Sequence, residues 1–161
     1  MLSIQMLARA PTKRSQSVIE GECNCGAVAY KVDAEISDVF ICHCSICRKS
    51  TGSGGIAVSI VGRDKFTWIR GQDKITYWSK PRHDWHSYFC SVCGSALPGE
   101  NDENNVYIPV GTITAGHEKL KVVHHMYVGS KASWEIIGDS GVQHPEGFGS
   151  GKARKSWWKF W

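Results

Sequence analysis

The chain has 161 residues, 42% of them hydrophobic and 21% charged, with a formal net charge of +4 at pH 7. This length suits one domain whose core needs no disulfides, and its seven cysteines cannot all pair within one chain. No apolar stretch approaches the ~20 residues that cross a bilayer, and residues 1–16 hold no secretory apolar run. We therefore expect a cytoplasmic protein that uses its thiols to bind metal.

The predicted elements are short strands. Residues 1–16 are predicted to be a flexible segment, and residues 17–149 the folded domain. Alternating runs of β-branched and aromatic residues predict strands at 28–32, 56–61, 66–69, 75–78, 87–89, 106–110 and 121–128. Residues 45–50 form a plausible helical turn, and Pro109 favours an edge position for its strand. The pattern is typical of a mainly β, mainly antiparallel domain.

The positive charge lies at the two ends of the chain. Residues 1–16 and 150–161 hold seven of the 19 basic residues and no acid, so the body carries 12 basic against 15 acidic residues. This balance disfavours a broad nucleic-acid-binding face. The tail ends in Trp157-Trp158-Lys159-Phe160-Trp161. Residues 150–161 therefore form a basic-aromatic tail, which either contacts a membrane surface, a partner or nucleic acid, or packs on its own domain or a neighbouring subunit.

Two cysteine pairs each precede a glycine. They are Cys23 and Cys25 before Gly26, and Cys90 and Cys93 before Gly94. Ligands this close in sequence reach one tetrahedral ion when the backbone turns tightly, and glycine permits that turn. The four thiolates are predicted to form a closed, structural zinc site, with mononuclear iron as an alternative.

The remaining cysteines lie within six residues. Cys42, Cys44 and Cys47 can bind one zinc ion and leave its fourth corner open, which is typical of catalytic sites. Alternatively, His43 or the distant His125 closes the site, or the three are buried or redox-sensitive thiols. A zinc ion with three thiolates is a poor generator of hydroxide, but it can stabilise a substrate thiolate. The spacing therefore favours making or breaking a carbon–sulfur bond over hydrolysis.

These cysteine groups and their surroundings resemble the glutathione-dependent formaldehyde-activating family, which includes the centromere-protein-V-like proteins. The residues that carry the resemblance are Gly21 to Tyr30, Cys42 to Gly52 and Phe89 to Ser95, with weaker support from Trp68 to Gly71, Gly111 to Ile113 and Tyr127 to Trp134. The resemblance implies a small antiparallel β-sheet zinc-knuckle fold. It also implies two zinc ions per chain: a structural ion on Cys23, Cys25, Cys90 and Cys93, and a catalytic ion on Cys42, Cys44 and Cys47.

The activity that the resemblance implies is that of a carbon–sulfur lyase acting on an S-hydroxymethyl thiol or another thiol adduct. Glutathione and formaldehyde are the candidate substrates. Arg48, Lys49 and Lys131 are candidates for holding the carboxylates of such a thiol, or are surface charges. His43 is predicted to be hydrogen-bonded behind the ligands, and the strand alternation points one of His124 and His125 inward.

The Gly52-Ser53-Gly54-Gly55 run is predicted to let backbone pass close to the cysteine turn.

The rival function is a non-catalytic zinc-binding module that contacts nucleic acid or protein through its tail. A homo-oligomer is compatible with either function, and formaldehyde scavenging without turnover is a third possibility.

Overall fold

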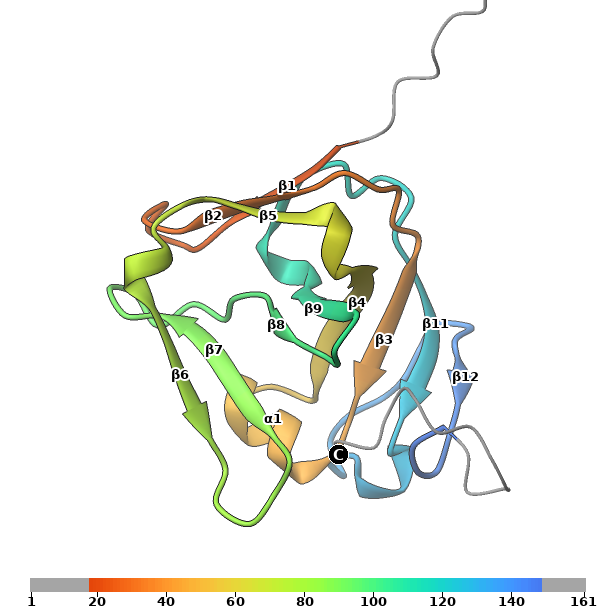
Figure 1. Ribbon diagram of the computed structural model, residues 1–161. Helices are drawn as coiled ribbons and strands as arrows, with labels where there is room; N and C mark the ends of the chain where they lie inside the picture. Colours follow the sequence, from red (N-terminus) through yellow and green to blue (C-terminus); the bar gives the residue numbers. More distant parts are fainter. Residues whose placement is uncertain (1–17, 149–161) are drawn as a thin grey trace, which may run out of the picture.

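The computed structural model describes residues 18–148, which form β-sheets and one short α-helix (Figure 1). The predicted N-terminal segment 1–16 and the predicted tail 150–161 lie outside these residues, so the division of the chain stays a prediction. The α-helix is α1 (Ser45–Thr51), and the 3₁₀ turns are η1 (Arg63–Lys65), η2 (Gln72–Lys74), η3 (Val110–Thr112) and η4 (Val128–Ser130).

The strands of the described region form three sheets. The four-stranded sheet has the order β10 (Ile113–Ala115), β1 (Ile19–Glu22), β2 (Ala29–Val32), β5 (Phe66–Arg70). The six-stranded sheet has the order β12 (Val142–Gln143), β11 (Lys121–Met126), β3 (Asp38–Cys42), β4 (Ile56–Gly62), β9 (Asn105–Pro109), β8 (Gly99–Glu100). The third sheet is the hairpin of β6 (Ile75–Ser79) and β7 (His86–Cys90).

The prediction of a mainly β, mainly antiparallel domain is confirmed, and the edge position expected from Pro109 is wrong. Most strand pairs are antiparallel, but β11 runs parallel to both β3 and β12. The strand that contains Pro109 is not an edge strand, because β9 pairs with β4 on one side and β8 on the other. β8 pairs only with Val106 and Tyr107, so the proline lies beyond the end of that ladder.

The main core lies between the four-stranded sheet and the β4–β9 part of the six-stranded sheet. Ile19, Tyr30 and Val32 from the first pack with Val61 and Ile108 from the second. Each of these side chains is at most 6% exposed. A Cβ on Gly21 would lie 2.2 Å from the Tyr30 ring, so glycine is required where this ring crosses β1. The two cysteine clusters lie outside this core, each in a smaller hydrophobic cluster of its own.

Among residues 18–148, no helix is both long and apolar enough to cross a membrane.

Candidate functional site: two cysteine centres

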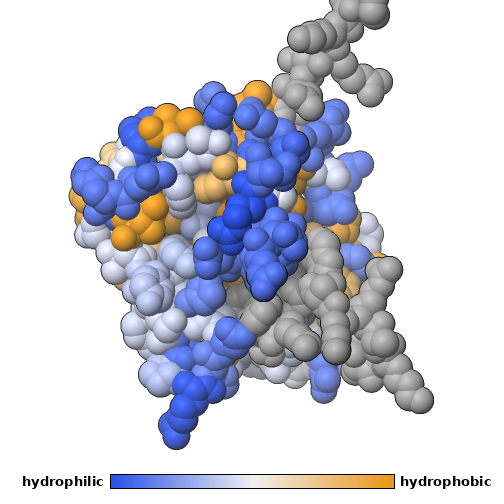
Figure 2. Space-filling model, in the orientation of Figure 1, coloured by the Kyte–Doolittle hydropathy of each residue, from blue (hydrophilic) through white to orange (hydrophobic). Residues whose placement is uncertain are grey.

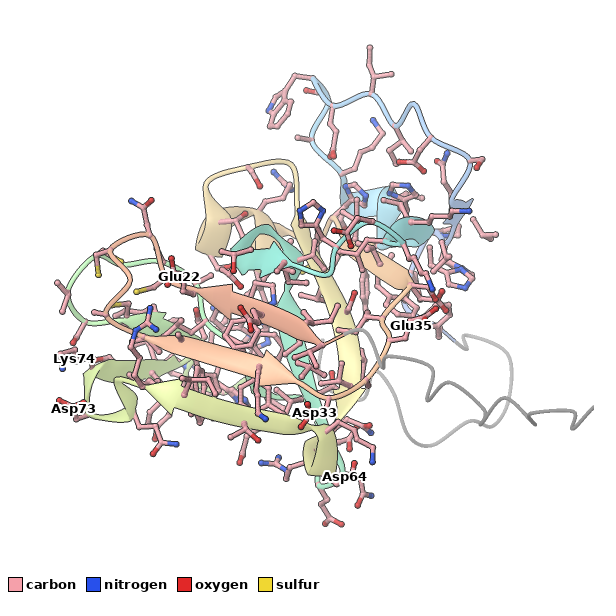
Figure 3. All side chains as sticks on the ribbon, turned by 90° about the horizontal axis from the view of Figure 1, so that it is seen from above. Glu22, Asp33, Glu35, Asp64, Asp73 and Lys74 are labelled. Atoms are coloured by element: carbon pink, nitrogen blue, oxygen red, sulfur yellow. The ribbon has the colours of Figure 1, made fainter. Side chains whose placement is uncertain are left out.

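The first cysteine centre joins two turns that are far apart in the chain. Cys23 and Cys25 follow β1, Cys90 ends β7, and Cys93 lies in the next turn. The four sulfur atoms lie within 4.8 Å of one another, with Cys25 Sγ 3.5 Å from Cys23 Sγ and 3.9 Å from Cys90 Sγ. Figure 3 shows sulfur atoms beside Glu22, at the end of β1. Zinc–sulfur bonds of about 2.3 Å in a tetrahedron separate the sulfurs by about 3.8 Å, so these donors fit one zinc ion.

The two turns of this centre have the same local construction. The Gly26 N–H donates to Cys23 O and the Gly94 N–H donates to Cys90 O, both at 2.8 Å. Both glycines have left-handed backbone angles, with φ of +71° and +73°. A residue with a Cβ adopts this conformation only with strain, so the glycines permit each turn to close.

Hydrogen bonds from the protein stabilise sulfur charge at this centre. The Val28 N–H donates to Cys23 Sγ at 3.3 Å. The Ser95 hydroxyl lies 3.3 Å from Cys93 Sγ and accepts the Asn24 N–H at 2.9 Å, so it links the two turns. Hydrogen bonding from Ser95 lowers the pKa of Cys93 to about 6. A low thiol pKa favours the thiolate that binds metal.

The second cysteine centre lies where β3 meets α1. Cys42 ends β3, Cys44 is the N-cap of α1 and Cys47 lies in the first turn of the helix. The three sulfur atoms lie within 4.8 Å of one another, and Cys44 Sγ accepts the Cys47 N–H at 3.4 Å. Cys42 and Cys47 are buried, whereas Cys44 is partly exposed. The cluster therefore offers three sulfurs to one ion and is open to solvent mainly at Cys44.

The three thiols of this centre compete for negative charge. Hydrogen bonds from Cys42 and Cys47 lower the pKa of Cys44 to about 2. The hydrogen bond to Cys44 raises the pKa of Cys42 to about 12, and contacts with both neighbours raise the pKa of Cys47. A divalent cation removes this competition, because it stabilises all three thiolates at once.

The predicted close passage of the glycine run beside the cysteine turn is confirmed. A Cβ on Gly55 would lie 2.5 Å from Cys42 O, and one on Gly54 would lie 2.5 Å from Glu135 Oε1. Side chains at these positions would push β3 and the loop at Glu135 away from the start of β4. The glycines therefore permit the turn and its neighbours to pack closely.

Behind the second centre lies a chain of four hydrogen-bonded residues. Glu135 Oε2 is 3.0 Å from His43 Nδ1, His43 Nε2 is 2.9 Å from His125 Nδ1, and His125 Nε2 is 2.8 Å from Asp139 Oδ1. His43 and His125 are only 1% and 2% exposed. The hydrogen bond from His125 holds the pKa of Asp139 below its usual range. All four ring nitrogens of the two histidines thus have partners other than the thiols.

The three predicted substrate-binding cations have different surroundings. Arg48 donates to His43 O at 3.3 Å and to Ser130 O at 3.2 Å, so it ties the cysteine turn to η4. Lys131 donates to Glu135 O at 2.7 Å. Lys49 is exposed on α1 and lines a groove. Their contact with substrate stays a prediction.

Several residues of the site were not predicted from the sequence. Glu135 and Asp139 bond to the buried histidines, and Ser95 links the two turns of the first centre. Asp139 Oδ1 accepts the Gly141 N–H at 2.8 Å, so the Asp-Ser-Gly sequence could have indicated an ordered Asx turn. No local signal marks Glu135, because its partner lies 92 residues away.

The fold and the two centres define a small β protein with two cysteine clusters that could hold metal ions. Residues 18–130 match the family model described as glutathione-dependent formaldehyde-activating enzyme. The chain belongs to this family, as its motifs suggested.

Two individual proteins are also similar to this chain. A Halomonas elongata protein, provisionally named a glutathione-dependent formaldehyde-activating enzyme, is 35% identical over 85 residues. The match covers 50% of this chain and 54% of the relative, so the chain spans about half the length of that curated protein. A crystal structure of a Rhodobacter sphaeroides protein aligns with a TM-score of 0.48 and 22% identity, covering 58% of this chain and 85% of that one.

Proposed function

We propose that this protein is a zinc-dependent carbon–sulfur lyase that acts on a thiol adduct, with S-hydroxymethylglutathione as the leading candidate. The two zinc ions would be held by the four-cysteine centre and the three-cysteine centre. The family description names glutathione and formaldehyde, which together supply this adduct. The proposal includes action in the cytoplasm, where glutathione is abundant.

The observation that carries the proposal is the donor set of the second centre. Cys42, Cys44 and Cys47 bring three sulfurs within 4.8 Å, while both ring nitrogens of His43 and of His125 are held in other hydrogen bonds. The two histidines considered as a fourth ligand are therefore engaged elsewhere. This supports a zinc ion with one coordination position left for substrate.

Bound zinc would supply a cation that stabilises the substrate sulfur as a thiolate. In the lyase direction the carbon–sulfur bond breaks, its electron pair stays on sulfur, and the hydroxymethyl group loses its hydroxyl proton to leave as formaldehyde. The chain itself holds the cysteine turn rigid. Arg48 ties that turn to η4, and the His43–His125 pair fixes it from behind.

Exchange spectroscopy by NMR tests the proposal. Zinc-loaded full-length protein is added to glutathione and formaldehyde at equilibrium, and the interconversion rate with S-hydroxymethylglutathione is measured. We expect the protein to accelerate the exchange and Cys44→Ser to abolish the acceleration, because one metal ligand is lost. Metal analysis of Cys44→Ser should still find the zinc of the four-cysteine centre.

Either of two results would contradict the proposal, and a third would contradict the role of Cys44 in it. One is no acceleration of exchange for glutathione or any other thiol adduct. The other is full activity in Cys44→Ser, which would place the chemistry away from this centre. Acceleration that Cys44→Ser retains only partly would also count against a required ligand role for Cys44.

A further inference from the structure

A groove of about 680 Å³ lies between α1 and the β6–β7 hairpin. Figure 1 shows this hairpin beside the helix, and in Figure 2 its tip projects at the bottom as a hydrophilic protrusion. Ile46, Trp78 and Phe89 give the groove apolar walls, and Lys49, Lys80 and His83 give it polar ones. This volume and mixed lining are typical of small-molecule sites.

The charge of the groove is cationic. No acidic side chain lines it, and within the described residues Lys49 and Lys80 take part in none of the salt bridges. The acids instead gather in a separate hollow of about 450 Å³ on the other side of Trp85. That hollow is lined by Asp84, Glu100, Asp102 and Glu103 together with Arg63. Because the two charges are separated in this way, the groove favours an anionic ligand.

The groove shares its helix with the second cysteine centre. Ser45 and Ile46, the two residues between Cys44 and Cys47, both line it. Residues of a helix follow one another by 100°, so Lys49 lies on the opposite face of α1 from Cys47, and Ile46 lies to the side. The groove and the sulfurs are therefore separated by the first turn of α1, which is ~10 Å across with its side chains.

Backbone hydrogen bonds order the tip of the hairpin. Lys80 N–H donates to Trp85 O at 2.8 Å, and His83 N–H donates to Lys80 O at 3.2 Å. Arg82 adopts a left-handed backbone angle, with φ of +63°, to make this turn. The wall that carries Lys80 and His83 is thus preformed.

We propose that this groove binds the carboxylate-bearing part of a peptide thiol substrate while its sulfur lies at the second cysteine centre. The proposal rests on the proposed function. Lys49 and Lys80 face the carboxylates, and Trp78 and Phe89 pack against the peptide. An extended tripeptide reaches ~10 Å, about the width of the helix, so its carboxylates can lie in the groove while its sulfur lies at the second centre. The carboxylate of cysteine lies only three bonds from its sulfur and cannot reach the groove from there. The groove therefore selects glutathione over cysteine.

Binding of S-methylglutathione tests the groove apart from any chemistry, because its blocked sulfur forms no thiolate. We expect its addition to zinc-loaded, ¹⁵N-labelled protein to shift the amide signals of residues 45–50 and 78–89. S-methylcysteine should not shift them. Lys80→Gln should weaken binding about five- to tenfold, as expected for a partly exposed ion pair. Lys119→Gln removes the same charge from an exposed pair with Glu35 and should bind as wild type.

The results separate the two proposals. Signals that do not shift, equal shifts with S-methylcysteine, or equal weakening by Lys119→Gln would overturn the groove assignment. Shifts in the expected residues without any exchange of S-hydroxymethylglutathione would support the groove and contradict the lyase. If exchange is seen, Lys80→Gln should raise KM for the glutathione adduct and leave kcat unchanged. It should also leave KM unchanged for the adduct of 2-mercaptoethanol, which has no carboxylate.

Discussion

At the scale of single residues, the buried pair of His43 and His125 determines how the second centre is supported. Three hydrogen bonds join these rings to each other and to Glu135 and Asp139. Every ring nitrogen of the pair is therefore held by another polar group, and both rings are fixed in orientation behind the cysteine turn.

Replacing His125 tests this support. His125→Ala leaves His43 Nε2 without its partner in a buried site and also opens a cavity, so we expect the free energy of unfolding to fall by about 2–4 kcal/mol. Urea denaturation of zinc-loaded protein measures the change. His117 is exposed and serves as the matched control, for which His117→Ala should stay within ~0.5 kcal/mol of wild type. An equal fall in the free energy of unfolding in the two variants would mean that the four hydrogen-bonded residues behind the second centre contribute little stability.

The two cysteine clusters could be predicted from the sequence because the spacing within each cysteine group is local. Cys44 and Cys47 lie one helical turn apart, and Cys93 is followed by the glycine that its turn requires. The partners of the buried histidines could not be predicted in this way. His43 and His125 are 82 residues apart and meet only because β11 lies beside β3.

At the scale of elements, the four-cysteine centre lies between the β1–β2 turn and the β6–β7 hairpin, where Trp68, Ile75 and Tyr88 also pack. Its small hydrophobic cluster contains Val28 and Leu97 besides the cysteines, and β6 and β7 pair only with each other among the described strands. A metal ion held by Cys23, Cys25, Cys90 and Cys93 would therefore tie the β1–β2 turn to the hairpin. Short elements of this kind depend on such a link for their stability.

The effect of losing this metal should be local. Cys93 is exposed, so Cys93→Ser removes a ligand with little loss of packing. We expect hydrogen exchange to speed up in residues 23–28 and 75–97, where the turn and the hairpin lie, and to change little in β3, β4 and β9. Hydrogen-exchange mass spectrometry measures this. Uniform acceleration across all strands, or none, would show that the centre does not act as a local tie.

Strand prediction succeeded for most strands with a pattern of their own, although β3, with its run Val39-Phe40-Ile41, was not predicted. β4 and β9 contain β-branched and aromatic runs that were identified, whereas β1 carries Gly21 and two acids in four residues and was missed. β8 and β12 have two residues each and are too short to show a period. The parallel pairing of β11 with β3 depends on the whole chain and has no local signal.

At the scale of the whole molecule, the three sheets place two chemically different centres apart. One lies at the β1–β2 turn and the other at the end of β3, each in its own hydrophobic cluster. The hairpin reaches from the first centre, at Cys90, to the groove beside α1, through Trp78 and Lys80. In the proposed function, the second centre holds a metal ion with one position open to a substrate thiol.

The most direct test of that claim is ¹¹³Cd NMR of the cadmium-loaded protein. We expect two resonances. One comes from a centre with four sulfur ligands, and the other from a centre with three sulfur ligands and one oxygen or nitrogen ligand. Adding glutathione should move only the second resonance into the four-sulfur range, and S-methylglutathione should not. A second resonance that already lies in the four-sulfur range, or that does not respond to glutathione, would contradict the claim.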